Sequence, residues 1–263
     1  MDKKLFHQVD AHNIRINHSS PTQALHEVES LIATGKNGYV CFVEANTFSQ
    51  AMKNPEIRDV INSSSMTYPD GISVAKIASL CSGEKIGRVS GPSFFLNCCE
   101  YGVDRQWRHF FFGGGDGVAQ KLAETMQKKY PGIQISGYYT PPFRPLTTEE
   151  ELQVKNMIES NNTDLLWVGL GGPKQELWMH SHLSGINVPV MFGVGAAFDF
   201  HTQTRPWAPK IIRTIGMEWL WRMISGGKQT CKRNLVCVSR IAIVFIRDFL
   251  HYKIISFLFH AKK

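Results

Sequence analysis

Short apolar runs alternate with amphipathic stretches along most of the chain. The runs with the length and composition of buried strands are Tyr39–Val43, His109–Phe112, Ile133–Ile135, Leu165–Val168 and Val188–Phe192. Between them, apolar residues recur at helical spacing in Pro55–Ile61, Val118–Lys129 and Glu149–Glu159. Strands that alternate with helices predict an α/β fold, with a mostly parallel sheet and helices on both faces.

The run Leu165–Val168 leads into a glycine-rich turn and a new helix. The turn is the segment GLGGP at 169–173, and a polar-then-apolar pattern begins at Lys174. In an α/β sheet, such a turn directs backbone N–H groups and the positive end of the helix beyond the strand's carboxyl end. The pattern therefore indicates a ligand site suited to phosphate, to which Gln175 adds a side-chain amide.

Asp70 occupies a similar place after another short apolar run. It lies between Pro69 and Gly71, after Met66–Tyr68 and before a helix that begins near Ile72. A carboxylate at the end of a strand faces the cleft of an α/β sheet and can serve there as a general base. The same position suits an aspartate that caps the helix, which is the more frequent role.

The last thirty residues have a different pattern. On a helix, Arg233, Arg240 and Arg247 recur every seven residues, with His251 one turn on. The opposite side carries the apolar residues Phe245, Ile246, Phe249, Leu250 and Phe257. The charges within 241–259 make it a poor bilayer span, because each central charge costs about 2.5–3.5 kcal/mol. We expect an amphipathic helix in the membrane interface; a terminal helix packed on the body is the alternative.

Composition adds a charge asymmetry to this pattern. The chain has 263 residues, 43% of them hydrophobic, and a formal net charge of +7. From Arg205 onward there are 12 Lys and Arg against 2 Asp and Glu, whereas the rest has 17 against 20. A basic C-terminal quarter implies an anionic partner such as membrane phospholipid, a diphosphate or nucleic acid.

The cysteines and the N-terminus indicate a cytoplasmic protein. The six cysteines form no CxxC pair and no zinc-ligand spacing, which is typical of reduced thiols in the cytosol. The N-terminal segment MDKKLFHQVDAHNI has no apolar signal core, so secretion is not expected.

Six blocks of the sequence resemble one family. They are YPDGIS at 68–73, FFGGGDGVA at 111–119, GYYTPPFRPLTTEE at 137–150, GLGGPKQE at 169–176, GVGAAFDFHT at 193–202 and APKIIRTIGMEWLWR at 208–222. In this order they resemble the WecG/TagA/CpsF glycosyltransferases (glycosyltransferase family 26). The resemblance implies an enzyme that moves a sugar from a nucleotide-sugar, with UDP as leaving group, to a polyprenyl-diphosphate-linked saccharide. It also implies a location on the inner face of the bacterial cytoplasmic membrane.

The resemblance also implies roles for particular residues. It favours Asp70 as the catalytic base over the capping role, and it makes Gln175 a residue that positions substrate. We expect the loop at 113–117 to receive the nucleotide; a simple turn that needs φ > 0 is the alternative explanation of its glycines. The residues expected to bind nucleotide or substrate are Asn46, Thr47, Gly113, Gly114, Gly115, Asp116, Gly171, Gly172, Pro173, Asp199, Arg205, Arg213, Arg222, Lys228, Lys232 and Arg233. For Asp199, binding a sugar hydroxyl and capping the next segment remain equal alternatives.

We expect neither a metal nor a cofactor. The chain has no Asp-x-Asp motif, and His180 and His182 diverge on a helix, so protein cations and backbone amides would stabilise the leaving diphosphate. We expect a Rossmann-like core at 1–203 and a basic appendage at 204–263 that closes the active site and associates with the membrane. Self-association is also possible in this family.

Two positions depart from the family pattern. Many members have a threonine near Phe42, so Asn46 or Thr47 would have to replace it. The stretch GGKQTCKRN at 226–234 has lysine where arginine is common, and lysine lacks the bidentate fork of arginine.

Two other classes of function are alternatives to this enzyme. An NAD(P)-binding oxidoreductase is disfavoured because Val118 occupies the place of the last glycine in G-x-G-x-x-G. A non-enzymatic module that binds nucleic acid or membrane through the basic tail remains open, but the tail has no recognisable nucleic-acid motif. The sequence does not determine the donor sugar.

Overall fold

The computed structural model describes residues 6–225 and 228–260. Its strands are β1 (Gln8–Ala11), β2 (Ile14–Asn17), β3 (Gly38–Val43), β4 (Met66–Pro69), β5 (Arg108–Gly113), β6 (Gln134–Tyr139), β7 (Leu165–Gly169) and β8 (Val190–Gly193). Its helices are α1 (Pro21–Ala33), α2 (Ala45–Ala51), α3 (Pro55–Ser63), α4 (Ile72–Ser82), α5 (Gly91–Val103), α6 (Val118–Lys129), α7 (Thr148–Ser160), α8 (Lys174–His182), α9 (Ala197–His201), α10 (Lys210–Thr214), α11 (Glu218–Ser225) and α12 (Lys228–His260).

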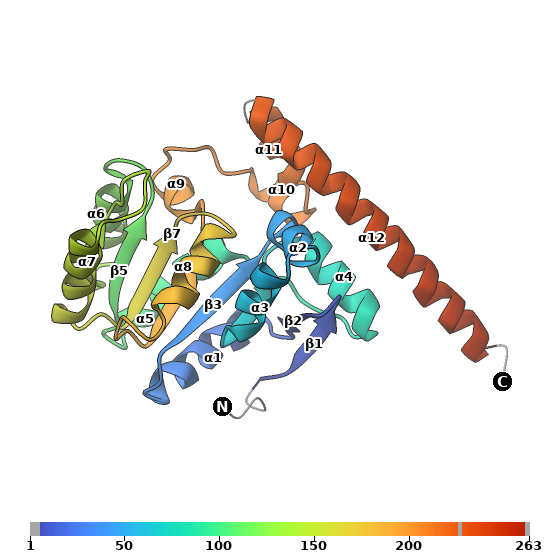
Figure 1. The fold of residues 1–263 in the computed structure, drawn as a ribbon, viewed down its shortest axis with the longest axis horizontal. Coiled ribbons are helices and arrows are strands. Elements are labelled where there is room, and N and C mark those ends of the chain that lie inside the picture. The colour runs from blue at the N-terminus through green and yellow to red at the C-terminus, as the bar shows by residue number, and fades with distance from the viewer. Residues whose placement is uncertain (1–5, 226–227, 261–263) are drawn as a thin grey trace.

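Six strands form a parallel sheet in the order β4-β3-β8-β7-β5-β6 (Figure 1). The predicted α/β fold is therefore confirmed. From β3 the chain continues to β4 at one edge of the sheet, and from β5 it continues to β6 at the opposite edge, so the direction of the connections reverses within the sheet. In open α/β sheets, ligands bind outside the carboxyl ends of the strands at the place where the direction reverses.

Side chains alternate between two apolar faces along each central strand. In β3, Tyr39, Cys41 and Val43 belong to one core cluster, and Val40 and Phe42 belong to the other. Helices α2, α3, α7 and α8 cover the first face, and α1, α5, α6 and α9 cover the second. Because both faces are buried, the strands read as continuous apolar runs, which is why the sequence predicts them well.

The predicted strand positions need small corrections at two places. The strand expected at 133–135 is β6, which continues to Tyr139, and the strand expected from Val188 begins at Val190. The antiparallel hairpin β1–β2 was not predicted. Its strands have four residues each, and its turn residues His12 and Asn13 have positive φ values of 56° and 64°. Glycine usually signals such a turn, and this turn has none.

Local sequence fixes the starts of several helices. Ser20 and Gln23 form a capping box at α1, and Thr147 and Glu150 form one at α7. Asn54 caps α3 by accepting a hydrogen bond from the N–H of Glu56, and Pro55 occupies the first position of the helix. These residues explain why helical periodicity locates α3 and α7 to within two residues of their observed ends.

Helices α10, α11 and α12 form the C-terminal appendage. Helix α12 passes alongside α2 and α4 and runs out beside the β1–β2 hairpin (Figure 1). Cys237 and Ile241 are buried against the body, so this part of α12 packs as a terminal helix, the alternative weighed above. Within the described residues, no helix combines the length and the apolar character needed to cross a bilayer.

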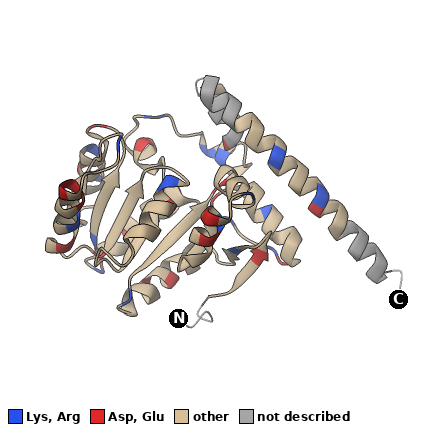
Figure 2. Cartoon of the chain, viewed as in Figure 1, with Lys and Arg blue, Asp and Glu red and all other residues tan. Residues whose placement is uncertain are grey.

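The sequence predicted an arginine stripe on one side of α12 and an apolar surface on the opposite side, but the apolar side chains differ in their exposure. Phe245 is half-buried against the body, whereas Ile246, Phe249 and Leu250 are exposed. Phe257 and Arg233 have side chains outside the described residues. Arg240 and Arg247 are exposed on α12, and Figure 2 shows Lys and Arg positions along this helix in blue.

Candidate active site

Most of the predicted site residues lie at the end of the sheet where the parallel strands have their carboxyl ends, called the carboxyl edge. Asp70 follows β4, and α2 with Asn46 and Thr47 follows β3. The glycine turn at 171–173 follows β7, and the loop at 113–117 follows β5. Parallel strands place these segments on the same side of the sheet, as the sequence analysis expects.

Asp70 is half-buried and does not cap the helix that follows it. The N-cap of α4 is Gly71, which makes no side-chain capping bond. The Asp70 Oδ1 atom instead accepts a hydrogen bond from the N–H of Gly91, 2.9 Å away, at the start of α5. Its own N–H donates to the carbonyl of Val43 at the end of β3, 3.0 Å away. The hydrogen bond to one carboxylate oxygen thus fixes the side chain of Asp70 at the carboxyl end of β4.

Arg88 was missed by the sequence analysis, and it links Asp70 to the appendage. Its guanidinium donates to the backbone carbonyl of Asp70 and, at 3.0 Å, to the carbonyl of Arg213. It also forms an ion pair with Glu218 of α11. Arg88 lies in the segment between α4 and α5, outside any predicted strand or helix, so the pattern of the sequence gave no signal for it.

Gln175 joins the two loops that follow β7 and β8. Its Oε1 atom accepts hydrogen bonds from the N–H of Gly171 at 3.1 Å and from the N–H of Gly195 at 2.9 Å. Its Nε2 atom donates to Oε1 of Glu176 at 2.9 Å. The side chain is buried, and this network orients it. Its predicted contact with substrate stays a prediction.

Glu176 is a second residue that the analysis of roles left out. It is 1% exposed, and among the described residues its Oε2 atom has no hydrogen-bond partner. Burial raises the pKa of Glu176 to about 7, and the nearby Glu44 adds to the rise. Glu44 caps α2 by accepting hydrogen bonds from the N–H groups of Asn46 and Thr47. Two carboxylates therefore share the space between β3 and the glycine turn.

Gly172 approaches Thr47 so closely that a side chain would not fit. A Cβ atom at Gly172 would lie 2.5 Å from Oγ1 of Thr47 and 3.3 Å from Oε2 of Glu176. Thr47 is thus beside the glycine turn. That Thr47 or Asn46 replaces the family threonine stays a prediction. Phe42 cannot contribute, because it is buried against Tyr68 and Phe94.

The loop at 113–117 contacts the neighbouring strand through its backbone. Gly114 donates its N–H to the carbonyl of Gly169, 3.1 Å away. Gly113 has φ 129°, and a Cβ there would lie 2.7 Å from the backbone of Gly169. Asp116 is exposed, and Gly117 begins α6 without a side-chain cap. The glycines thus have a packing reason, while nucleotide binding by this loop stays a prediction.

The predicted residues beyond β8, apart from Arg205, lie on the helices α9 to α12. The carboxylate of Asp199 accepts a hydrogen bond from the Thr204 hydroxyl at 3.2 Å, so it stabilises the turn after α9. Arg205 is exposed. Arg213 places its guanidinium 3.7 Å from the centroid of the Trp207 ring. The side chains of Arg222, Lys228, Lys232 and Arg233 lie outside the described residues.

The described histidines do not gather at this edge with metal-ligand spacing. His180 is 3.2 Å from the hydroxyl of Tyr39, and His182 is bonded to the carbonyl of Trp178. The groups of described side chains close enough to share an ion are His7–His18–Glu84 and His12–Cys81–Asp248, around the hairpin and α4.

Comparison with known proteins gives a consistent result over nearly the whole chain. The model described as the glycosyl transferase WecG/TagA/CpsF family matches residues 9–254. Three relatives share the name N-acetylglucosaminyldiphosphoundecaprenol N-acetyl-beta-D-mannosaminyltransferase. The one from Bacillus subtilis is 27% identical over 214 residues, 81% of this chain and 82% of the relative. The one from Bacillus spizizenii is 25% identical over 190 residues, 72% of each chain, and one from Staphylococcus aureus is 24% identical over 224 residues, 84% of this chain and 86% of the relative.

Proposed function

The chain belongs to the WecG/TagA/CpsF family of glycosyltransferases, and from this premise we propose that it transfers a sugar from a UDP-sugar to a polyprenyl-diphosphate-linked saccharide. The names of the relatives favour N-acetylmannosamine as the sugar and N-acetylglucosaminyl-diphosphoundecaprenol as the acceptor. Such a reaction belongs to the synthesis of bacterial cell-surface polysaccharide. Because the family consists of glycosyltransferases, we no longer favour a non-enzymatic module or an NAD(P)-dependent oxidoreductase.

Asp70 carries the proposal, because its carboxylate stands at the carboxyl end of β4 with one oxygen held by Gly91. In the proposed step, Asp70 takes the proton of the acceptor hydroxyl. The hydroxyl oxygen attacks the anomeric carbon, and the bond from that carbon to the diphosphate breaks, leaving its electron pair on UDP. A single displacement of this kind inverts the anomeric carbon, so an α-linked donor yields the β-linkage in the relatives' names.

The departing diphosphate requires positive groups, and we assign these to the protein rather than to a metal. Apart from Gly114 and Gly171, whose N–H groups donate within the fold, the backbone N–H groups of the turns at 113–117 and 171–173 would bind the nucleotide. Gln175 would position the substrate. Arg205, Arg213, Arg222, Lys228, Lys232 and Arg233 would offset the diphosphate charge from the appendage. The ion pair of Arg88 with Glu218 supports this arrangement, since Arg88 also bonds to the carbonyl of Asp70 and so links α11 to the residue that follows β4.

The appendage would also carry the enzyme to its lipid-linked acceptor. Exposed apolar side chains occur on all three of its helices: Ile211, Ile215, Ile224, Leu235, Ile243, Ile246 and Leu250. Together with the basic charge of this quarter, they suit the inner surface of the cytoplasmic membrane. We propose peripheral association at that surface.

Replacing Asp70 with Asn tests the mechanism. With UDP-N-acetylmannosamine and N-acetylglucosaminyl-diphosphoundecaprenol, we expect D70N to lower kcat at least about 100-fold, because the amide cannot accept the proton. Product formation is measured by mass spectrometry, and UDP binding by calorimetry should stay unchanged. D104N, at an exposed aspartate after α5, is the control and should keep full activity. Near wild-type turnover by D70N would exclude the mechanism, and loss of wild-type turnover in EDTA would exclude its metal-free form.

A further inference from the structure

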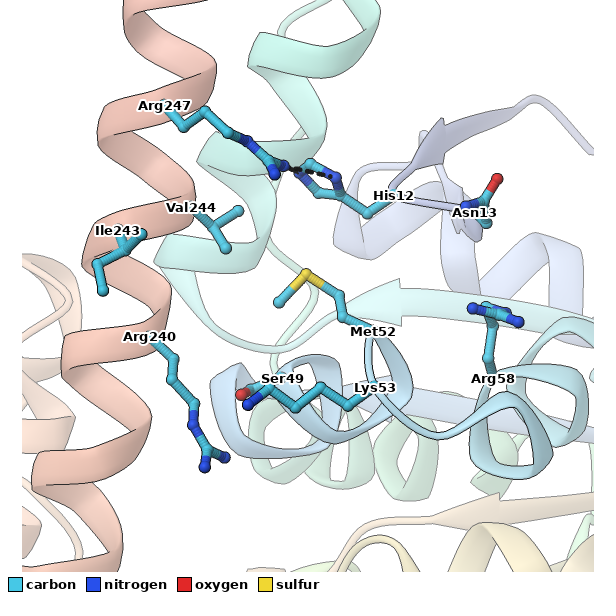
Figure 3. A pocket seen from close by; sticks show the side chains of 10 residues that line it. All are labelled: His12, Asn13, Ser49, Met52, Lys53, Arg58, Arg240, Ile243, Val244 and Arg247. Carbon is cyan, nitrogen blue, oxygen red and sulfur yellow. Dashed lines mark hydrogen bonds between the residues drawn. The ribbon is translucent and has the colours of Figure 1, made fainter.

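A pocket of about 410 Å³ lies between α12 and the body, on the side of α2 away from its N-terminus. Its lining comes from the hairpin turn, the segment from α2 to α3, and α12 (Figure 3): His12, Asn13, Ser49, Met52, Lys53, Arg58, Arg240, Ile243, Val244 and Arg247. None of these residues belongs to the candidate active site. The pocket exists because α12 packs on the body, so the sequence pattern did not show it.

The polar lining of this pocket is strongly basic. Lys53 and Arg58 come from the body, Arg240 and Arg247 come from α12, and no lining residue is acidic. Figure 3 shows Arg240 extending from α12 toward α2, where Lys53 extends toward α12. Arg247 donates a hydrogen bond to Nδ1 of His12 at 3.1 Å and forms an ion pair with Asp248 at 3.3 Å. Arg247 is thus compensated by Asp248, but Lys53, Arg58 and Arg240 also line this hollow. An anion bound there would relieve the repulsion among these three cations.

Ser49 provides a second, independent sign of a ligand. Its side chain lines the pocket and is 1% exposed, and its hydroxyl has no hydrogen-bond partner among the described residues. A buried polar group without a partner is unfavourable, so it needs an explanation. The hydroxyl can donate to an oxygen of an anion held by Lys53 and Arg240.

The apolar part of the lining indicates which anion fits. Met52, Val244 and Ile243 line the pocket, and Ile243 is 68% exposed. Ile246, Phe249 and Leu250 continue this exposed apolar surface along α12. A ligand with a charged head and long apolar chains matches both parts, whereas nucleic acid would need aromatic side chains for stacking, which this lining lacks.

We propose that this pocket binds the phosphate of an anionic phospholipid headgroup, with its acyl chains along the exposed apolar side chains of α12. The inference rests on the proposed association of the appendage with the membrane and adds a specific lipid site to it. A lipid bound there would hold α12 against the body at the membrane surface, at a site distinct from the candidate active site.

The test compares two double variants of the full chain that remove the same charge. K53Q/R58Q empties the body side of the pocket of cations, and K121Q/K128Q removes two exposed lysines of α6 outside it. Binding is measured by flotation with vesicles of phosphatidylcholine alone and of phosphatidylcholine with phosphatidylglycerol. We expect K53Q/R58Q to weaken binding to the anionic vesicles about tenfold or more and K121Q/K128Q less than about twofold. S49A should weaken the same binding without any change of charge.

Each outcome separates the lipid site from the alternatives. Equal weakening by both double variants would reduce the effect to net charge and overturn the proposal. Unchanged binding of K53Q/R58Q would overturn it while leaving membrane association intact. Absence of vesicle binding by the wild-type chain would overturn both. In calorimetry with inorganic phosphate, binding that is lost in K53Q/R58Q, without an effect of this variant on vesicles, would assign the pocket to free phosphate instead.

Discussion

At the scale of single residues, Gln175 and Glu176 are unusual in the candidate site because both polar side chains are buried. The amide oxygen of Gln175 accepts hydrogen bonds from the loops after β7 and β8, and its amide nitrogen donates to Glu176. Because Glu176 is buried with one oxygen unpartnered, its charged form is destabilised, and its pKa rises to about 7. The sequence block PKQE shows both residues, but the sequence cannot show which of them is buried beside another carboxylate.

This raised pKa predicts a particular dependence of stability on pH. The ordinary pKa of glutamate is 4.5, so between pH 4.5 and about 7 the folded chain keeps a proton that the unfolded chain loses. The free energy of unfolding should therefore fall as pH rises through this window and level off above pH 7. We expect E176Q, which is neutral at every pH, to gain on the order of 3 kcal/mol relative to wild type between pH 4.5 and 8.

Urea unfolding of both proteins across this range measures the effect. E100Q is the matched control, because Glu100 is exposed on α5. If wild type and E176Q show parallel stability curves, Glu176 is not protonated in the folded chain at neutral pH.

At the scale of elements, helix α12 is connected to the hairpin and to α4 by polar contacts. His12 Nε2 and Asp248 Oδ2 are 2.7 Å apart, and Cys81 Sγ lies 3.9 Å from the same Asp248 oxygen. The side chain of Asp248 is 11% exposed, which makes it unusual on a helix whose neighbouring residues face solvent. The short hairpin, which the sequence did not predict, thus provides the partner that holds the far part of α12.

Removing this contact should loosen α12 without disturbing the sheet. We expect D248A to raise amide hydrogen exchange in residues 241–252 about tenfold or more, because a charged, largely buried hydrogen bond is lost. Exchange in β7 should not change. D59A, at an exposed aspartate of α3, is the control. Unchanged exchange in 241–252 would mean that apolar packing alone holds the helix.

At the scale of the whole molecule, the body and the appendage contribute unequally to the core. Both core clusters are built from residues before 204, apart from the buried Cys237 and Ile241 and the partly buried Val244 and Phe245. All six strands of the parallel sheet also belong to the body. The appendage therefore adds little to the core, but it reaches the site through Arg88 and Glu218.

A chain truncated after residue 203 should consequently fold and yet fail in transfer. We expect far-UV circular dichroism to show a cooperative transition, at a lower Tm because part of α4 loses its cover. Sugar transfer should fall at least about 100-fold, because the cations of the appendage are gone. The full chain is the reference in both measurements. An unfolded truncated chain would contradict the proposed domain boundary, and a fully active one would contradict the role of the appendage.

The sequence by itself determined the α/β class, the central strands and the family, because buried parallel strands and glycine turns leave local signals. It also placed Asp70 and the glycine turns at the ends of strands. Only the tertiary structure decided what depends on contacts between distant residues. The carboxylate of Asp70 meets Gly91 rather than its own helix, Glu176 meets Glu44, and α12 meets the hairpin. Hydrogen bonds and burial between distant segments arise when the chain is packed, so no local pattern records them.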